Sequence, residues 1–177
     1  MNFHPLIQQQ IIIYYDTKSS SLVKHPPVAV EPYTFAPFSN QNILFSYDAF
    51  WGLVLSESTK SEIWRSWWVQ RLLWDINGHL TFTSPAHQIN MTSTSRKIPH
   101  NIKEDENVGR LVRYLSSWKS TKLTLVERIE QLTVDMIKQN FCDTEQFKII
   151  KAWLDDLQQI NYLFPSIKSG TSQQVTF

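Results

Sequence analysis

The chain has 177 residues, and its 17 Lys and Arg against 16 Asp and Glu give a formal charge of +1, so charge gives no reason to expect nucleic acid or an anionic membrane as the main partner. This length suits one globular core that buries roughly 70% of the unfolded surface. The single cysteine excludes an internal disulfide framework and a cysteine-based zinc cluster, and only four glycines disfavour glycine-rich phosphate loops.

The first half of the chain predicts short strands around an extended segment. Residues 11–15 are β-branched and aromatic, which predicts a buried strand. Prolines within residues 23–42 exclude a regular helix and a central strand there. That segment also carries aromatic residues that need a surface to pack on, namely Tyr33, Phe35 and Phe38. The apolar runs 43–47 and 50–55 predict two further strands flanking a turn, and residues 79–83 predict another.

The strongest helix prediction covers residues 59–77. Thr59 followed three residues later by Glu62 fits a capping box, and Asn77 with Gly78 fits a left-handed helix end. Apolar residues occupy nearly every side of this helix, which predicts that it runs through the core.

The remainder of the chain is predicted to be helical after a polar loop at residues 88–105. Apolar periodicity predicts three helices, with apolar faces over residues 108–118, 125–137 and 147–160. Asp143 with Gln146 is a predicted cap for the last of them. The tail, residues 166–177, lacks periodicity and is expected to be disordered. Every apolar run falls well short of the ~20 residues that span a bilayer.

Two features of the predicted helix allow both a structural and a functional interpretation. Glu62 and Arg65 lie one turn apart at its start, where they could form a capping box with an ion pair. Alternatively, Glu62 faces a cleft as a general base or hydrogen-bond acceptor. The tryptophans at 64, 67, 68 and 74 could stack on sugar rings or bases, although core packing is the favoured interpretation. Arg71 and Asp75, four residues apart, predict a structural ion pair.

The sequence offers few other signs of chemistry. The five histidines are scattered, with no HxH or HExxH spacing, so no metal site is predicted from them. No D-x-D motif for a Mg²⁺ or Mn²⁺ nucleotide-sugar complex occurs in the sequence. Asn90 begins a triplet that is an N-glycosylation acceptor if the protein is lumenal or secreted.

Five runs of the sequence resemble the STELLO family of glycosyltransferase-like proteins. They are YTFAPFSNQNILFSYDAFWGLVL, EIWRSWWVQRLLWDINGHLTFTSP, IPHNIKED, LSSWKSTKLTLVERIEQL and KAWLDDLQQINYLFP. The resemblance covers roughly residues 11–165 and extends weakly to the reversibly glycosylated polypeptides. It implies a GT-A-like α/β fold, here an incomplete mixed sheet with a buried Trp-rich helix and a C-terminal helical segment.

The resemblance also implies the divisions of the chain and its site. Residues 1–104 would be a partial glycosyltransferase-like region on the acceptor side, 105–165 a helical region, and 166–177 a disordered tail. Glu62 is the catalytic candidate. The substrate-binding candidates are Arg65, Asn40, Gln41, Asn42, Trp64, Arg71 and His100. No metal ligand is expected in this chain, whereas full-length relatives would use Mn²⁺ or Mg²⁺ with a nucleotide sugar.

Two functions follow from the resemblance. In the family, the half that binds the nucleotide sugar precedes the segment seen here, so we expect a fragment or a shortened paralogue. The first function is transfer of a sugar from a nucleotide sugar to a glycan acceptor, at the Golgi membrane or in its lumen. The alternative is a non-catalytic binding or assembly module, with protein partners in a Golgi glycan-synthesis complex.

Overall fold

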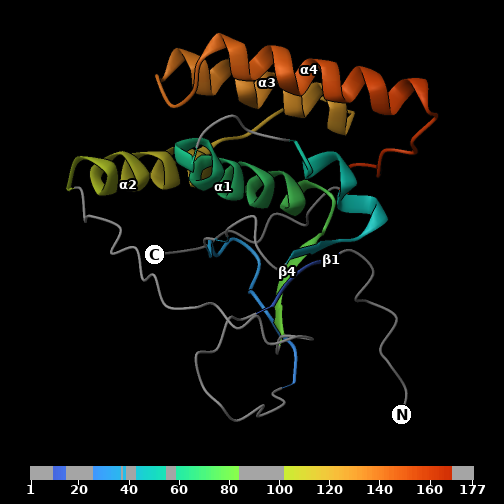
Figure 1. Cartoon of the computed structure of the whole chain (residues 1–177), viewed down its shortest axis with the longest axis horizontal. Helices are drawn as coiled ribbons and strands as arrows, with labels where there is room; N and C mark the ends of the chain where they lie inside the picture. The colour runs from blue at the N-terminus through green and yellow to red at the C-terminus, as the bar shows by residue number, and fades with distance from the viewer. Residues whose placement is uncertain are drawn as a thin grey trace, which may run out of the picture.

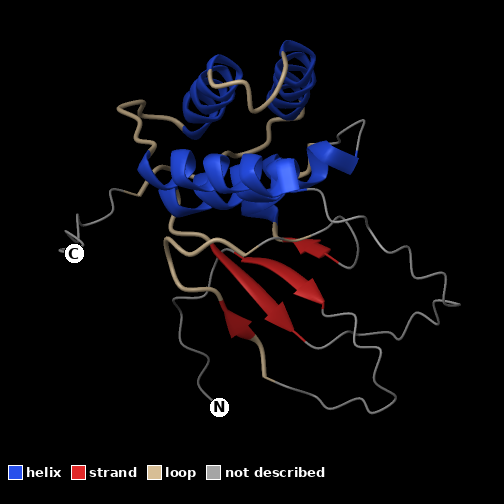
Figure 2. Ribbon diagram, turned by 90° about the vertical axis from the view of Figure 1, so that its left-hand side faces the viewer, coloured by secondary structure: helices blue, strands red, loops and turns tan. Residues whose placement is uncertain are grey.

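The computed structural model of the chain describes residues 10–14, 26–36, 38, 43–54, 59–83 and 102–168. The described part consists of a sheet and two layers of helices (Figures 1 and 2). In chain order the elements are β1 (Gln10–Tyr14), β2 (Val28–Ala29), β3 (Ile43–Phe45), the 3-10 helix η1 (Tyr47–Gly52), α1 (Thr59–Asp75), β4 (His79–Thr83), α2 (Ile102–Ser117), α3 (Leu125–Lys138) and α4 (Thr144–Gln159). The chain is therefore a mixed α/β protein.

The four strands form one mixed sheet in the order β2-β4-β1-β3. β1 runs parallel to β4 and antiparallel to β3, so that Ile12 pairs with both Thr81 and Leu44. β2 is a two-residue edge strand antiparallel to β4. Its edge position agrees with the expectation from the prolines of this segment, which lack a backbone N–H for a central ladder.

Helix α1 lies beside α2 in the layer between the sheet and helices α3 and α4 (Figures 1 and 2), and every side chain from Trp64 to Leu73 is buried. This confirms the prediction of a helix through the core. The predicted left-handed end is also confirmed: Asn77 has a φ of 58°, and the Gly78 N–H donates to the Leu73 carbonyl at 2.8 Å. This bond satisfies one of the carbonyls that the end of a helix leaves without partners.

The three C-terminal helices occur where the apolar periodicity predicted them. Thr124 and Glu127 form a capping box at the start of α3, and the Asp143 carboxylate accepts a hydrogen bond from the Gln146 N–H at 2.9 Å, as predicted for α4. Helix α2, however, begins at Ile102, inside the segment expected to be a polar loop. Its first turn is polar, so apolar periodicity could not reveal it, whereas acidic residues near a helix start favour the helix.

The predicted strand at residues 50–55 is wrong, because the described residues there, 50–54, contain the end of the 3-10 helix η1 and no strand. The turn buries Ala49 and Trp51 completely, and the Trp51 indole N–H donates to the Asp48 carbonyl at 2.9 Å. The Trp153 indole N–H, from α4, donates to the Trp51 carbonyl at 3.0 Å. This partner lies 102 residues away, so a local pattern of apolar residues could not distinguish the turn from a strand.

Candidate functional site

The sequence places its catalytic candidate in the first turn of α1, which the structure confirms as helical. The Glu62 side chain lies outside the described residues, and its role stays a prediction. One turn later, Arg65 is only 4% exposed, and its Nη1 donates to the Val54 carbonyl at 2.8 Å. Arg65 therefore ties the end of the segment after η1 to the helix that carries Glu62.

The tryptophans of α1 divide into a core group and a surface residue. Trp64, Trp67 and Trp68 are at most 9% exposed, and the Trp64 ring meets the Trp68 ring edge-on at 6.1 Å between centroids. Core packing is thus confirmed for these residues. Trp74, at the end of the helix, is half-buried and presents part of its ring to solvent.

Arg71 is the centre of a buried charged network. Its Nη1 donates to the Asp75 carboxylate at 2.9 Å, which confirms the predicted ion pair. Its Nη2 donates to the Trp118 carbonyl at 2.9 Å, and its guanidinium lies 4.9 Å from the Trp118 ring centroid. Arg128 of α3 places its Nη1 2.9 Å from the second oxygen of Asp75. The network joins α1 to α3 and to the end of α2.

The other substrate-binding candidates lie outside the described residues. They are Asn40, Gln41, Asn42 and His100, and their roles stay predictions. Phe38, the last described residue before Asn40, is buried and meets Phe45 edge-on at 6.5 Å between centroids. Trp64, Arg65 and Arg71 are all buried along α1, but Arg71 lies about two turns after the other two and has its own partners, Asp75 and the Trp118 carbonyl.

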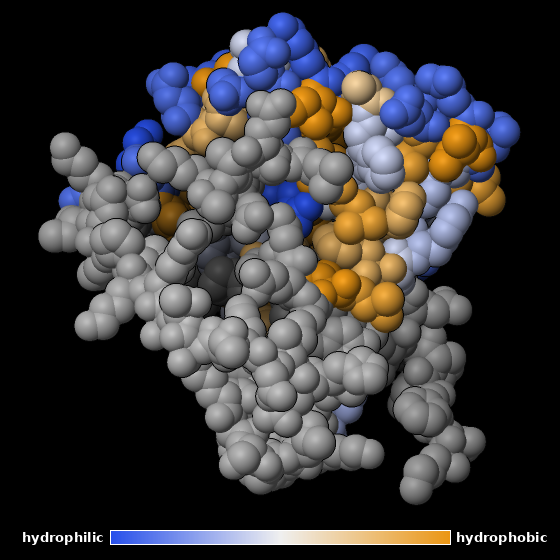
Figure 3. Space-filling view, viewed as in Figure 1, coloured by the Kyte–Doolittle hydropathy of each residue, from blue (hydrophilic) through white to orange (hydrophobic). Residues whose placement is uncertain are grey.

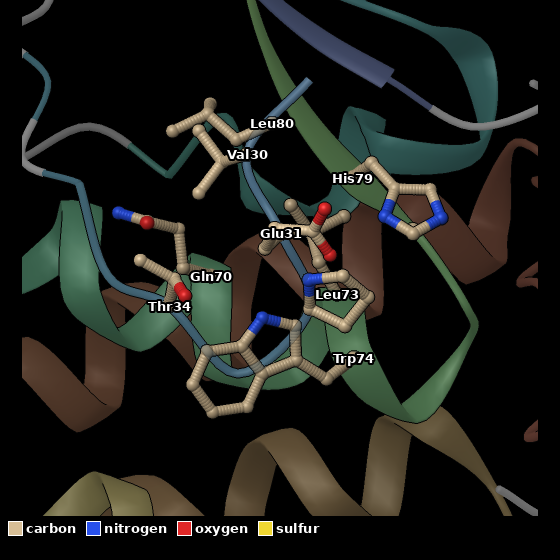
Figure 4. Close-up of a pocket in the computed structure, with 10 residues that line it drawn as sticks. Val30, Glu31, Thr34, Gln70, Leu73, Trp74, His79 and Leu80 are labelled. Carbon is tan, nitrogen blue, oxygen red and sulfur yellow. The ribbon is translucent and has the colours of Figure 1, made fainter.

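A shallow pocket that sequence reasoning missed lies at the other end of α1 (Figure 4). It has a volume of about 220 Å³, including space open to solvent. Its lining comes from the turn after β2, the end of α1 and the start of β4: Val30, Glu31, Pro32, Thr34, Gln70, Leu73, Trp74, Gly78, His79 and Leu80.

The wall of this pocket is fixed to α1 by one glutamine. The Gln70 side chain accepts a hydrogen bond from the Ala36 N–H at 2.8 Å and donates to the Ala36 carbonyl at 2.7 Å. It imitates the pairing of a neighbouring strand. The Val30 N–H also donates to the Leu80 carbonyl, at 2.7 Å. Within the segment that the sequence marked as extended, Val30 is therefore tied to the sheet and Ala36 to the helix.

The predicted aromatic packing of that segment is confirmed as well. The Phe35 ring lies 4.5 Å from the Trp74 ring and 5.5 Å from the Trp67 ring. The Tyr33 ring lies 5.3 Å from Trp74. The sequence held one signal for the pocket: aromatic residues in an extended segment needed a surface to pack on, and a helix rich in tryptophan follows in the chain. The sequence did not say which tryptophan they would meet.

Within the part of the chain that the structure describes, no group of three or more His, Cys, Asp or Glu residues could hold a metal ion. The metal implied for full-length relatives has no fitting ligand set among these described residues. No described helix is long and apolar enough to cross a membrane.

Comparison with known proteins shows the family to which this chain belongs. The family model described as STELLO glycosyltransferases matches residues 59–176, from the first residue of α1 onward. The chain belongs to this family. It is 31% identical over 170 residues to a protein named "Probable glycosyltransferase STELLO2" from Arabidopsis thaliana, and 31% identical over 171 residues to "Probable glycosyltransferase STELLO1" from the same plant.

Both alignments with the STELLO proteins cover 89% of this chain but 22% of the relative. The chain thus spans less than a quarter of the length of these relatives. No solved structure matches it.

Proposed function

We propose that this chain is the acceptor-side and C-terminal portion of a STELLO-type glycosyltransferase, and that it takes part in transferring a hexosyl or pentosyl unit from a nucleotide sugar. The observation that supports this proposal is the position of the family match. It begins at Thr59, the first residue of α1, and it includes the four α-helices of the described residues. The family match thus includes the helix that carries Glu62.

Within this proposal Glu62 acts on the acceptor. The start of a helix carries a partial positive charge, which stabilises a carboxylate in the first turn. As a general base, Glu62 would accept the proton of the acceptor hydroxyl while that oxygen forms a bond to the anomeric carbon. The bond from the anomeric carbon to the nucleotide breaks, and the nucleotide leaves with the electron pair. Arg65 would position this turn through its bond to Val54.

The remaining components of the reaction are also proposals. A nucleotide sugar with Mn²⁺ or Mg²⁺ would be bound by parts of the longer protein that precede this segment, and the reaction would take place in the Golgi lumen.

The experiment compares Glu62→Gln with Glu145→Gln in the full-length protein. Glu145 lies in the first turn of α4 and serves as the matched control. We expect Glu62→Gln to leave nucleotide-sugar binding intact while turnover falls by about 10²-fold or more, and Glu145→Gln to change neither. Failure to bind any nucleotide sugar in the presence of Mn²⁺ would overturn the proposal. If Glu62→Ala costs on the order of 1 kcal/mol of stability and turnover is unchanged, Glu62 is a helix cap only.

A second candidate, a non-catalytic assembly module, is favoured by apolar side chains at one end of the helices. Tyr47, Ile160 and Leu163 are 59%, 70% and 75% exposed, and the Leu163 N–H donates to the Tyr47 hydroxyl at 3.3 Å. Figure 3 shows hydrophobic residues gathered on the side where η1 meets the end of α4. The upstream coding sequence discriminates between the candidates: an in-frame anchor helix and a D-x-D-bearing βαβ region favour the transferase, and their absence favours the module.

A further inference from the structure

The pocket at the end of α1 is lined by the half-buried Trp74 and by polar side chains that the fold does not use, and the exposed Tyr33 ring lies beside Trp74 at its edge. We propose that it is a binding subsite for a neutral sugar ring, which stacks on Tyr33 and Trp74 and places hydroxyl groups against Glu31 and His79. The subsite would hold a unit of the glycan acceptor, so this inference rests on the proposed function for the role of the sugar. The binding itself can be measured without any transfer reaction.

The backbone at Tyr33 is the first observation. The Thr34 N–H donates to the Glu31 carbonyl at 3.1 Å, which closes a turn with Pro32 and Tyr33 at its centre. Tyr33 has a φ of 64°, in the left-handed region that glycine and asparagine occupy at such a position and that bulky residues rarely adopt. Its side chain is nevertheless 67% exposed. A strained turn that displays a large aromatic ring to solvent points to a function for the ring.

The platform under this ring is rigid before any ligand arrives. Trp74 is packed against Phe35 on one side, and the Arg71 guanidinium lies 5.7 Å from its ring centroid. The clamp of Gln70 on Ala36 fixes the segment that follows the turn. Preformed aromatic surfaces with a few converging polar groups are typical of small-molecule sites.

The polar lining is the third observation. Figure 4 shows the Glu31 carboxylate, the His79 imidazole and the Trp74 ring around the pocket. Among the interactions of the described residues, none involves the side chain of Glu31, Thr34 or His79. A carboxylate accepts hydrogen bonds, whereas hydroxyl and imidazole groups both donate and accept, and a sugar ring offers matching hydroxyls.

The charge of the pocket selects a neutral ligand over a nucleotide. Its lining includes a glutamate but neither Lys nor Arg, whereas phosphates are usually bound by cations or by a helix start. The pocket instead lies beside the end of α1, where the helix carries partial negative charge. A ligand with apolar C–H faces and uncharged hydroxyls fits these conditions.

The test titrates the ¹⁵N-labelled full chain with cellotetraose, xylotetraose, maltotetraose and mannotetraose, and follows the indole N–H signals by NMR. The Trp74 signal is assigned with Trp74→Phe. We expect at least one tetrasaccharide to shift the Trp74 signal while uridine diphosphate does not. Tyr33→Gly, which removes the ring but suits the left-handed backbone, should raise Kd about tenfold without lowering Tm. Glu31→Gln should raise Kd by a similar factor.

Tyr47→Ala is the matched control, because Tyr47 is similarly exposed but its ring packs against Tyr162 instead of Trp74. It should leave Kd unchanged. The proposal is overturned if no tetrasaccharide shifts the Trp74 signal, if Tyr33→Gly and Glu31→Gln leave Kd unchanged, or if a proline-rich peptide binds at Trp74 and the sugars do not. Tetrasaccharide binding in a protein that binds no nucleotide sugar would leave this inference standing while overturning the proposed function.

Discussion

Replacing Asp75 by Asn should be among the most destabilising conservative changes in the chain. The carboxylate is 10% exposed and faces two guanidiniums, those of Arg71 and Arg128, which are 9% and 15% exposed. Removing one partner of a buried ion pair leaves a charge without compensation, which costs about 3–5 kcal/mol in fully buried cases. Arg128 can regain some water, so we expect a loss of about 3 kcal/mol.

The assay is urea unfolding followed by circular dichroism, together with the melting temperature. For a chain of this size, a loss of about 3 kcal/mol corresponds to a drop of roughly 6–12 °C in Tm. The midpoint in urea should fall with little change in the slope. The loss should persist at 1 M salt, because buried pairs are screened less than exposed ones.

The matched control is Asp155→Asn. Asp155 also pairs with a cation four residues away on its helix, but that pair, with Lys151, is about half exposed, and Lys151 keeps Glu130 as a second partner. Exposed pairs contribute little, so Tm should not change measurably. Equal losses for Asp75→Asn and Asp155→Asn, or a loss at Asp75 that salt abolishes, would refute the view that burial gives this network its importance.

Three further predictions concern single residues. Gly78→Ala should destabilise the protein by about 1–3 kcal/mol, because a Cβ there would lie 2.8 Å from a methyl group of Leu73. Gly109→Ala in α2, where a Cβ would meet no atom closer than 4.0 Å, should stabilise the protein by about 0.5–1 kcal/mol. Thermal melts in which both substitutions shift Tm in the same direction would contradict this prediction. Gln70→Ala should cost about 2–3 kcal/mol and speed hydrogen exchange at the Ala36 amide, which loses its partner; an unchanged exchange rate would count against the clamp. Burial raises the pKa of the Cys142 thiol to about 12. The rate of alkylation at pH 8 should therefore be at least ~100-fold lower than for a free thiol, and this rate should rise about tenfold per pH unit. A rate that stops rising below pH 10 would show that the thiolate is not disfavoured.

Local signals in the sequence were sufficient for most helices. The asparagine and glycine at 77 and 78 marked the end of α1, and the Asp143 cap marked the start of α4. These features involve residues within a few positions of one another, so a short stretch of sequence is enough to predict them. The start of α2 was missed because its first turn offers no apolar face.

The pairings that shape the site join residues far apart in the chain. The Gln70 clamp on Ala36 spans 34 positions, and the bond from Arg71 to the Trp118 carbonyl spans 47. Neither leaves a periodic trace. The capping box at Thr124 was, by contrast, a readable signal that sequence reasoning overlooked.

The sequence by itself determined that a tryptophan-rich helix would be buried on most sides, because apolar residues around its full circumference leave no face for water. It also determined that the proline-containing segment could not become a central strand. Only the tertiary structure decided which tryptophan stayed at the surface and which polar groups met it. That choice depends on how the 31–34 turn approaches the end of α1, and a contact between distant segments is fixed by packing rather than by local propensity.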